Sequence, residues 1–261
     1  MREWNAATYH RVSAPQFDWG LAVLERLPLA GHELVVDVGC GTGRLTSLLL
    51  DRLPHGAAVA VDLSANMLHV ARAEMPAGHQ PRVHFVLASA LALPVHERAD
   101  AVFSTATFHW VLDHPALFRS LHDALRPGGV LVAQCGGAGN LARIHARADA
   151  LMRQDDLAPF FSAWTEPWEF ADAATTAARL ADAGFAAIAT NVEATPFIQP
   201  DADAYAVFVR NVICRPHLAC LPDEPRRAAF IDALTRLAAQ DDPPFELDYW
   251  RLNMSARRPL R

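Results

Sequence analysis

Apolar and polar positions along the chain fall into segments whose period switches repeatedly between that of a strand and that of a helix. Short apolar runs typical of buried strands occupy residues 34–38, 57–62, 83–88, 99–105 and 129–135. Helical spacing lies before and between these runs, over residues 16–27, 43–52, 65–75 and 115–125. Ser64 and Asp113 precede two of the helical segments and are typical N-cap residues. Strands alternating with helices at this spacing predict a parallel sheet with helices on both faces.

The pattern changes after Gly139. Helical spacing there covers residues 141–154, 172–183 and two parts of 201–240 that are separated around the sequence RPHLACLPDEP. An aromatic, irregular segment lies at 159–170. Strand-like alternation covers residues 185–194 and runs again from Leu247 to Ala256.

We therefore expect one domain overall, made of four successive parts. These are an N-terminal cap helix segment at 1–30, a Rossmann-like core at 31–139, a lid of helical and aromatic insertions with the sixth strand at 140–220, and a C-terminal helix and last strand at 221–261 that complete the core.

Composition narrows the possible chemistry. The chain has 261 residues, of which 52% are apolar, enough for one large α/β domain or for a domain with a lid. The net charge of −6 argues against nucleic acid as the main partner. All 23 residues of the Lys and Arg class are arginine. The lack of lysine excludes Schiff-base chemistry and a Walker-type nucleotide site.

Cellular location can also be addressed from the sequence. No apolar run reaches the ~18 residues that a membrane span requires, so we expect no membrane association. The first residues, MREWNAATYHRV, contain no apolar signal region, which favours a cytoplasmic protein. The four cysteines are too few for a disulfide scaffold of this size. The sequence does not indicate an oligomeric state.

The strongest chemical signal is the segment LVVDVGCGTG at 34–43. A predicted strand runs into Gly39, Gly41 and Gly43, and a second strand ends at the acid Asp62. Glycines allow the backbone to approach a ligand closely, and the following helix can direct N–H groups toward an anion. An acid after the second strand suits a ribose diol. This order predicts a nucleoside-cofactor site, although a tight turn without a ligand remains an alternative.

A dinucleotide-binding fingerprint is the main rival interpretation of the loop. It requires a third glycine at the position of Arg44. The strand of a dinucleotide fold also usually has an apolar residue where this chain has Asp37. Both departures argue against a nicotinamide cofactor.

Four blocks, DVGCGTG, VDLS, VFSTATFHWVLDH and LRPGGVLV, occur in an order and spacing that resemble the class I S-adenosylmethionine-dependent methyltransferases. The match covers roughly residues 30–135. Within that group, WNAATYHRVSAPQ and FHWVLDH are most similar to the trans-aconitate methyltransferase type. The resemblance implies a Rossmann-like, doubly wound α/β fold with a seven-stranded, mostly parallel sheet, an antiparallel last strand and a helical lid. It also implies S-adenosyl-L-methionine as cofactor and S-adenosyl-L-homocysteine as product.

The resemblance also implies individual roles. The methionine part of the cofactor would lie over a loop of Asp37, Gly39, Cys40, Gly41 and Gly43, and near Thr105 and Ala106. Asp62 would accept hydrogen bonds from both ribose hydroxyls. The adenine would contact Leu63 and Met67 on its face and Ala88, Ser89 and Ala90 at its edge. Relatives often have an acid at the position of Ser89, which makes this contact a departure from the pattern.

Methyl transfer needs alignment more than it needs protein chemistry, because the sulfonium methyl group is already activated. A carboxylate acceptor needs no general base, whereas a phenol, an alcohol or a carbon acid does. His109 is the first candidate base, with packing or cofactor shielding as the alternative. His10 is the second, if the N-terminal segment folds over the site.

Residues beyond the core would select the acceptor. An acceptor pocket or a local lid core would explain the aromatic residues Phe160, Phe161, Trp164 and Trp168. A carboxylate could be held by arginines, for which the candidates are Arg143, Arg147, Arg153 and Arg210, with solvated surface charge as the alternative. The segment from Cys214 through His217 to Cys220 lacks the fourth ligand of a zinc site, so we expect no metal.

The sequence thus predicts an S-adenosylmethionine-dependent methyltransferase that acts on a small molecule, with carboxylate O-methylation as the leading reaction. A C- or N-methyltransferase of a quinone or natural-product pathway is the second hypothesis. A non-catalytic cofactor-binding module is the third. Nucleic acid and membrane are not expected as partners.

Overall fold

The computed structural model describes residues 14–260 and divides them into two compact units. The first unit holds the chain up to Ala138, together with Trp168–Glu193 and the segment from Arg251 onward. The second unit consists of Gly139–Pro167 and Ala194–Trp250. Of the expected lid at 140–220, residues 140–167 and 194–220 therefore belong to the second unit, and residues 168–193 belong to the first. The second unit also includes residues 221–250, which lie beyond the expected lid.

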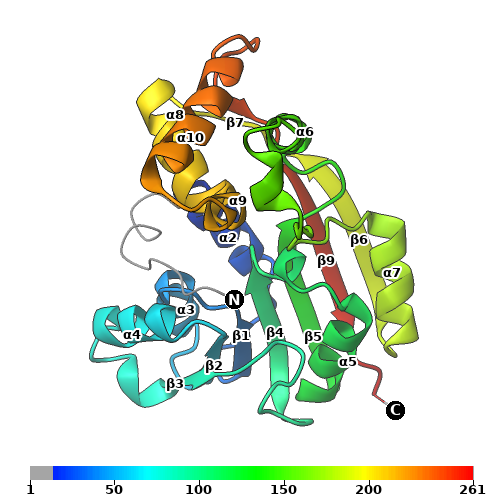
Figure 1. The fold of residues 1–261 in the computed structure, drawn as a ribbon. Coiled ribbons are helices and arrows are strands. Elements are labelled where there is room, and N and C mark those ends of the chain that lie inside the picture. Colours follow the sequence, from blue (N-terminus) through cyan, green and yellow to red (C-terminus); the bar gives the residue numbers. More distant parts are fainter. Residues whose placement is uncertain (1–13, 261) are drawn as a thin grey trace. The chain divides into compact units, whose positions relative to one another are not determined.

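A seven-stranded sheet forms the centre of the first unit, in the order β3-β2-β1-β4-β5-β9-β6 (Figure 1). The strands are β1 (Leu34–Val38), β2 (Ala57–Asp62), β3 (Val83–Leu87), β4 (Ala99–Thr105), β5 (Leu125–Gly136), β6 (Ala186–Ala194) and β9 (Trp250–Arg257). From β3 to β5 all neighbours pair in parallel, and β9 pairs antiparallel with β5. The predicted fold class, a mostly parallel seven-stranded sheet with an antiparallel last strand, is confirmed.

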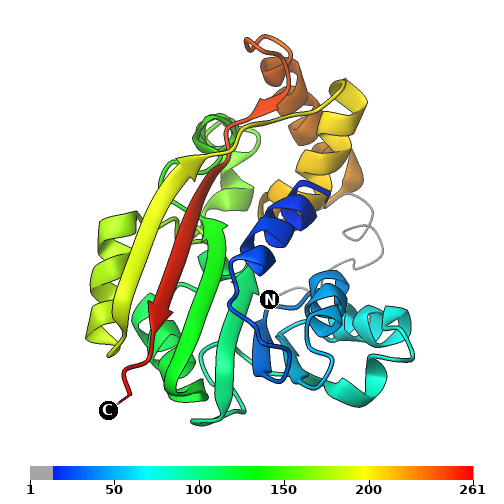
Figure 2. The same ribbon diagram turned by 180° about the vertical axis from the view of Figure 1, so that it is seen from behind.

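Strand alternation builds two helical layers on this sheet. In β1, Val36 faces one apolar cluster with α5 (His114–Ala124) and α7 (Ala173–Asp182), whereas Val35 faces the other. The second cluster contains residues of α2 (Ala14–Glu25), α3 (Arg44–Asp51) and α4 (Ala65–Glu74). Figure 1 shows α5 and α7 in front of the strands, and Figure 2 shows α2 on the opposite side. The order of strands reverses between β1 and β4, where open α/β sheets bind ligands.

Two local expectations were wrong. Strand β5 begins at Leu125 and not at residue 129, because the extended backbone favoured by a residue before proline ends α5 ahead of Pro127. Gly128, with φ of 81°, then lets the strand continue through the turn-like sequence RPGGV. The expected break around RPHLACLPDEP contains the helix α9 (Arg215–Cys220), whose Pro216 stands in the first turn, where proline is tolerated.

The second unit is mainly helical. Its helices are α6 (Ala142–Met152), α8 (Ala202–Phe208), a π-helical turn (Val209–Ile213), α9 and α10 (Glu224–Ala238), with a 3-10 turn at Ala158–Phe161. The short strands β7 (Phe197–Ile198) and β8 (Glu246–Leu247) pair antiparallel. Two-residue strands are too short to show a period, so the sequence did not predict them. No helix within residues 14–260 is long and apolar enough to cross a membrane.

Candidate functional site

A glycine turn connects β1 to α3 at the carboxyl edge of the sheet. Gly39, Gly41 and Gly43 have φ values of 74°, 55° and 78°, which L-residues with side chains rarely adopt. The N–H groups of Gly39 and Cys40 both donate to the carbonyl oxygen of Val61 in β2, at 2.7 and 3.0 Å. The turn is therefore fixed to the end of the neighbouring strand before any ligand binds.

The three glycines differ in the space that a side chain would find at each position. A Cβ atom on Gly39 would lie 2.0 Å from the hydroxyl oxygen of Thr107, so that position is closed by the protein itself. A Cβ atom on Gly43 would lie 3.1 Å from the side chain of Ala71 in α4. A Cβ atom on Gly41 would meet no atom within 4 Å, because Gly41 faces a cavity. Only Gly41 leaves room for a ligand against its own backbone.

Asp62 ends β2 beside this turn. Its carboxylate accepts the N–H of Gly41 at 2.9 Å through one oxygen and the N–H of Ser64 at 2.8 Å through the other. The Ser64 hydroxyl in turn caps α4 by accepting the N–H of Met67 at 3.2 Å. One carboxylate thus links the glycine turn to the start of the next helix.

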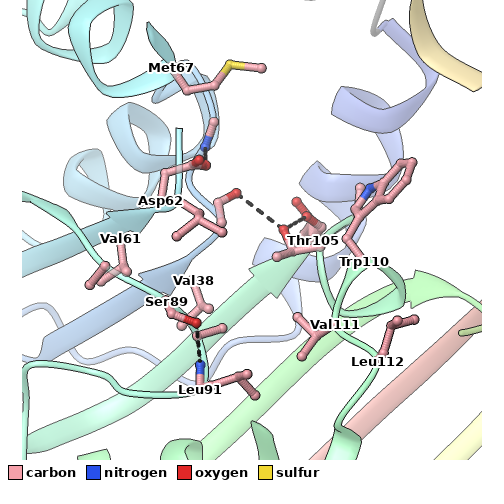
Figure 3. Close-up of a pocket in the computed structure, with 17 residues that line it drawn as sticks. Val38, Val61, Asp62, Met67, Ser89, Leu91, Thr105, Trp110, Val111 and Leu112 are labelled. Atoms are coloured by element: carbon pink, nitrogen blue, oxygen red, sulfur yellow. Dashed lines mark hydrogen bonds between the residues drawn. The ribbon is translucent and has the colours of Figure 1, made fainter. Parts of the chain in front are cut away.

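The cavity beside Asp62 has a volume of about 270 Å³ (Figure 3). Three large apolar side chains on its wall are unusually open to solvent, with exposed fractions of 53% for Leu63, 42% for Leu91 and 56% for Leu112. A bound flat apolar group would cover these surfaces. The cavity is lined by Val38, Gly39, Gly41, Val61, Asp62, Leu63, Met67, Ala88, Ser89, Ala90, Leu91, Thr105, Ala106, Thr107, Trp110, Val111 and Leu112.

Ten of the residues predicted to contact the cofactor line this cavity. They are Gly39, Gly41, Asp62, Leu63, Met67, Ala88, Ser89, Ala90, Thr105 and Ala106. Asp37, Cys40 and Gly43 do not line it. The sequence prediction missed the wall formed by Trp110, Val111 and Leu112. The FHWVLDH block marked this segment, but only the tertiary structure turns its side chains toward the cavity.

Asp37 lies behind the turn, only 2% exposed, and accepts the Thr46 hydroxyl of α3 at 2.6 Å. Burial raises the pKa of this carboxyl to about 7, the charge of Asp62 adds to the increase, and the Thr46 hydrogen bond opposes it. Near neutral pH the site therefore contains one buried carboxyl poised between its two protonation states. A cation bound nearby would favour the ionised form.

The other two loop residues line neighbouring hollows. Cys40 is 9% exposed, and burial, followed by the charges of Asp37 and Asp62, raises the pKa of its thiol well above the ordinary value. This thiol is therefore not a thiolate nucleophile at neutral pH. Gly43 caps α3 in the left-handed conformation, which suits its place at the helix start.

His109 does not line the cavity, although the next residue, Trp110, does. The Nδ1 atom of His109 accepts the N–H of Gly136 at 3.2 Å, so a neutral ring carries its proton on Nε2. Burial, and then the charge of Arg251 and of His114, lower the pKa of His109 to about 3. These features favour the packing role over proton abstraction. His10, the second candidate base, lies outside the described residues.

The turn that carries His109 is held from behind by three consecutive residues. The N–H of Glu169 donates to the carbonyl oxygen of His109 at 2.8 Å, Phe170 stacks on the His109 ring, and Trp168 packs edge-on against Trp110. Of the four aromatic residues considered for an acceptor pocket, Trp168 is thus part of this support.

A buried histidine continues the support of the same turn. His114, 1% exposed, hydrogen-bonds the carbonyl oxygen of Phe108 through Nε2 at 3.1 Å and contacts Arg179 through Nδ1 at 2.9 Å. Arg179 also pairs with Glu169 at 2.5 Å. These contacts fix the backbone from which the Trp110–Leu112 wall projects.

The other three aromatic candidates belong to the second unit. Phe161 packs against Phe230, and Trp164 stacks on His217 with ring centroids 4.6 Å apart. Phe160 lies beside the Arg226 guanidinium. These contacts are those of a local core.

Carboxylates of the second unit already neutralise most of its candidate arginines. Arg143 pairs with Glu246 at 2.5 Å, Arg210 with Glu224 at 2.5 Å, and Arg147 binds both oxygens of Asp241. The fourth candidate, Arg153, is exposed. Within the described residues, no group of three or more His, Cys, Asp or Glu side chains could hold a metal ion.

Known proteins resemble this chain in sequence along almost its whole length. A family model described as a methyltransferase domain matches residues 35–129. A trans-aconitate 2-methyltransferase from Methylobacterium radiotolerans is 34% identical, over 94% of this chain and 92% of that protein.

Solved structures are similar in fold. A methyltransferase-like protein from Bacillus halodurans has a TM-score of 0.63 at 18% identity, covering 92% of this chain and 98% of that one. A phosphoethanolamine N-methyltransferase from Haemonchus contortus, solved with S-adenosyl-L-methionine, has a TM-score of 0.62 at 19% identity. That match covers 97% of this chain and 56% of that one.

The two cavity-edge glycines should respond differently to substitution. We expect Gly41→Ala to cost about 1–2 kcal/mol of stability through its positive φ. Its methyl group would enter the cavity, so S-adenosylhomocysteine binding should weaken at least about tenfold. Gly39→Ala should lower the melting temperature further, because its Cβ overlaps Thr107. Thermal denaturation and isothermal titration calorimetry measure both effects. The reverse ranking, with Gly39→Ala the milder change in stability, would contradict this assignment.

The raised pKa of Asp37 predicts that both the stability of the protein and its relative affinity for the two ligands depend on pH. The carboxyl ionises near pH 3.8 when unfolded and near 7 when folded, so stability should fall as pH rises through this window. A sulfonium cation favours the ionised carboxyl. The affinity for S-adenosylmethionine relative to uncharged-sulfur S-adenosylhomocysteine should therefore rise as pH increases through about 7.

Calorimetry with both ligands at several pH values checks this prediction. The ratio of the two dissociation constants isolates the sulfonium charge, since the ligands share every other ionisable group. Asp37→Asn, which retains a carbonyl acceptor for Thr46, is the control and should give a ratio independent of pH. A pH-independent ratio in the unsubstituted protein would refute the proposed coupling.

Proposed function

This chain belongs to the class I S-adenosylmethionine-dependent methyltransferases and methylates a small molecule, and on this basis we propose that its acceptor atom is a carboxylate oxygen.

The cavity residues fit the cofactor. Asp62 lines the cavity with a carboxylate, an acceptor of the kind that suits ribose hydroxyls, and the half-exposed leucines offer apolar surface for adenine. Gly41 leaves its backbone open to a close approach. We propose that the thirteen loop and wall positions identified from the sequence serve this ligand, with Asp37, Cys40 and Gly43 acting from behind the lining. The cofactor, when bound, supplies an activated methyl group on a sulfonium sulfur.

The observation that carries the carboxylate proposal is the lack of a base on the described cavity wall. Of its lining side chains, only Asp62 is ionisable, and we assign that carboxylate to the ribose hydroxyls of the cofactor. A phenol, an alcohol or a carbon acid must lose a proton as it attacks. A carboxylate is already ionised at neutral pH and needs only alignment and exclusion of water.

His109 supports the same interpretation. A general base needs a free lone pair and a pKa near the working pH, whereas this ring has a pKa of about 3 and its Nδ1 is engaged by Gly136. We propose that His109 shapes the wall that shields the reaction, through its neighbour Trp110. A base role for His10 would favour the alternative C- or N-methyl transfer.

A relative's substrate gives independent support. The Methylobacterium radiotolerans protein, which matches nearly the whole chain, is named for trans-aconitate, the anion of a carboxylic acid. The arginines Arg143, Arg147 and Arg210 do not contribute to the proposal, because their charges are paired within the second unit.

The test is a methyl-transfer assay with a mixed panel of small carboxylic acids, phenols, amines and quinols. Product is identified by mass spectrometry, and S-adenosylhomocysteine release is measured in parallel. We expect a methyl ester, which mild alkali cleaves back to the acid, whereas ethers and C- or N-methyl products resist that treatment. Asp62→Ala, which removes the proposed ribose acceptor, is the inactive control.

The pH profile gives a second criterion. At saturating cofactor and acceptor, the rate should change little between about pH 6 and 9, because the acceptor is ionised throughout. Methylation only of phenols or carbon centres, with a rate that rises with pH, would refute the carboxylate proposal. Cofactor binding without turnover of any panel member would favour a non-catalytic module.

A further inference from the structure

A second hollow, with a volume of about 70 Å³, adjoins the cavity at the glycine turn and at the end of β4. Helix α2, which packs on α3, β4 and β5, contributes Gln16 and Phe17 to its wall. The residues that line both spaces are Gly39, Gly41, Thr105 and Ala106. A ligand bound beside the end of β4 therefore lies next to both the cavity and the hollow.

Within the described residues, the wall of this hollow carries a positive charge and no carboxylate. Its remaining members are Cys40, Thr42, Arg44 and Leu45. The Arg44 guanidinium lies 3.9 Å from the centroid of the Phe17 ring, a cation–π contact that holds the charge at the wall. Asp62 lines the cavity but not the hollow, and Asp37 lines neither. The hollow therefore favours an anionic group over a cationic one.

A buried arginine adds positive charge behind this wall. Arg251, only 2% exposed, donates from Nε to the side-chain oxygen of Gln134 at 3.3 Å. Gln134 pairs with Thr105 in the register of β4 and β5, and its carbonyl oxygen accepts the N–H of Ala106 at 2.8 Å. The guanidinium thus lies one to two strand spacings, about 5–10 Å, from the part of the wall that both spaces share.

Helix α2 connects the same charge to the hollow from the other side. The Arg251 guanidinium lies 4.8 Å from the centroid of the Trp19 ring. Trp19 follows Gln16 by three residues, so the two side chains are neighbours on the helix surface. Amide and indole groups are neutral, so these contacts hold the guanidinium in place without neutralising it. Burial first, and the charge of Arg251 second, lower the pKa of His109, so the field of this charge extends to the turn after β4.

We propose that this hollow is a subsite for a carboxylate of the acceptor other than the one that receives the methyl group, and that Arg44 on its wall and Arg251 behind it supply the positive potential. The reacting carboxylate has to lie in line with the sulfonium methyl group, so a group in the adjoining hollow is a second one. The amino-acid end of the cofactor suits the hollow less, because its ammonium group would face two guanidinium groups and no carboxylate of the described wall. The inference rests on the proposed function, since it requires a carboxylate acceptor.

Steady-state kinetics with two acceptors tests the subsite. A symmetrical dicarboxylic acid and its monoamide share the reacting carboxylate and differ in the charge of the second group. The unsubstituted protein should prefer the dicarboxylic acid in kcat/KM by at least about tenfold. Arg251→Gln should lower this preference about tenfold, mainly through KM, which is the effect of one charge across about 10 Å at an effective dielectric constant of ~20. The ratio between two acceptors cancels a general loss of active protein.

Three further variants separate charge from packing. Arg251→Lys retains the positive charge and should keep the preference within about threefold, measured at about pH 6, where a buried amine holds its proton more readily. Arg44→Gln should lower the preference as Arg251→Gln does, and it decides the outcome if Arg251→Gln does not fold. Arg98→Gln removes the same charge from an exposed arginine that precedes β4, at the other end of the strand, and should leave the preference unchanged. Thermal denaturation checks that each variant is folded.

A binding experiment distinguishes the acceptor from the cofactor as the source of the carboxylate. S-adenosylhomocysteine has an amino-acid end, and 5′-methylthioadenosine lacks it. Isothermal titration calorimetry should give a ratio of their dissociation constants that Arg251→Gln changes by less than about threefold. A change of about tenfold that weakens only S-adenosylhomocysteine would assign the hollow to the carboxylate of the cofactor and overturn the inference.

Failure of the subsite and failure of the proposed function give different results. An unchanged preference for the dicarboxylic acid in folded Arg251→Gln and Arg44→Gln would overturn the subsite, while methyl esters would still form. Equal turnover of the two acceptors by the unsubstituted protein would also overturn it. The absence of a methyl ester from every carboxylic acid, with the unsubstituted protein, would refute the proposed function itself.

Discussion

The end of β2 organises the site. The carbonyl oxygen of Val61 accepts two N–H groups of the glycine turn, and the next residue, Asp62, holds Gly41 and the start of α4 through its carboxylate. Both strands are buried and paired in parallel, so their ends have little freedom. This junction therefore sets the turn, the acid and the first helical residues of the cavity in one rigid arrangement before a ligand is present.

The same junction brings two acids close together in a poorly solvated place. Asp37 and Asp62 interact, and burial already disfavours the charge on Asp37. Such an arrangement costs stability in the empty protein and is relieved by a bound cation. We propose that a bound sulfonium cation removes part of this electrostatic penalty and that its removal contributes to the binding free energy.

The opposite wall depends on a different kind of support. Trp110 projects from a turn whose backbone is held by Glu169 and, through Phe108, by His114, and Arg179 joins these two supports. These residues do not line the cavity. The ring nitrogens of His109 and His114 serve as fixed hydrogen-bonding points in this support.

The sequence by itself determined the order of strands and helices from β1 to β5, the glycine turn and the acid of β2, because periodicity, caps and glycine conformations are local properties of the chain. The resemblance read from the sequence also indicated ten of the lining residues, most of which lie at or just after a strand end. The tertiary structure alone decided that Arg143 and Arg147 are neutralised by acids far along the chain, and that the Nδ1 atom of His109 meets Gly136. Contacts between distant segments set burial and charge pairing, and no local pattern records them.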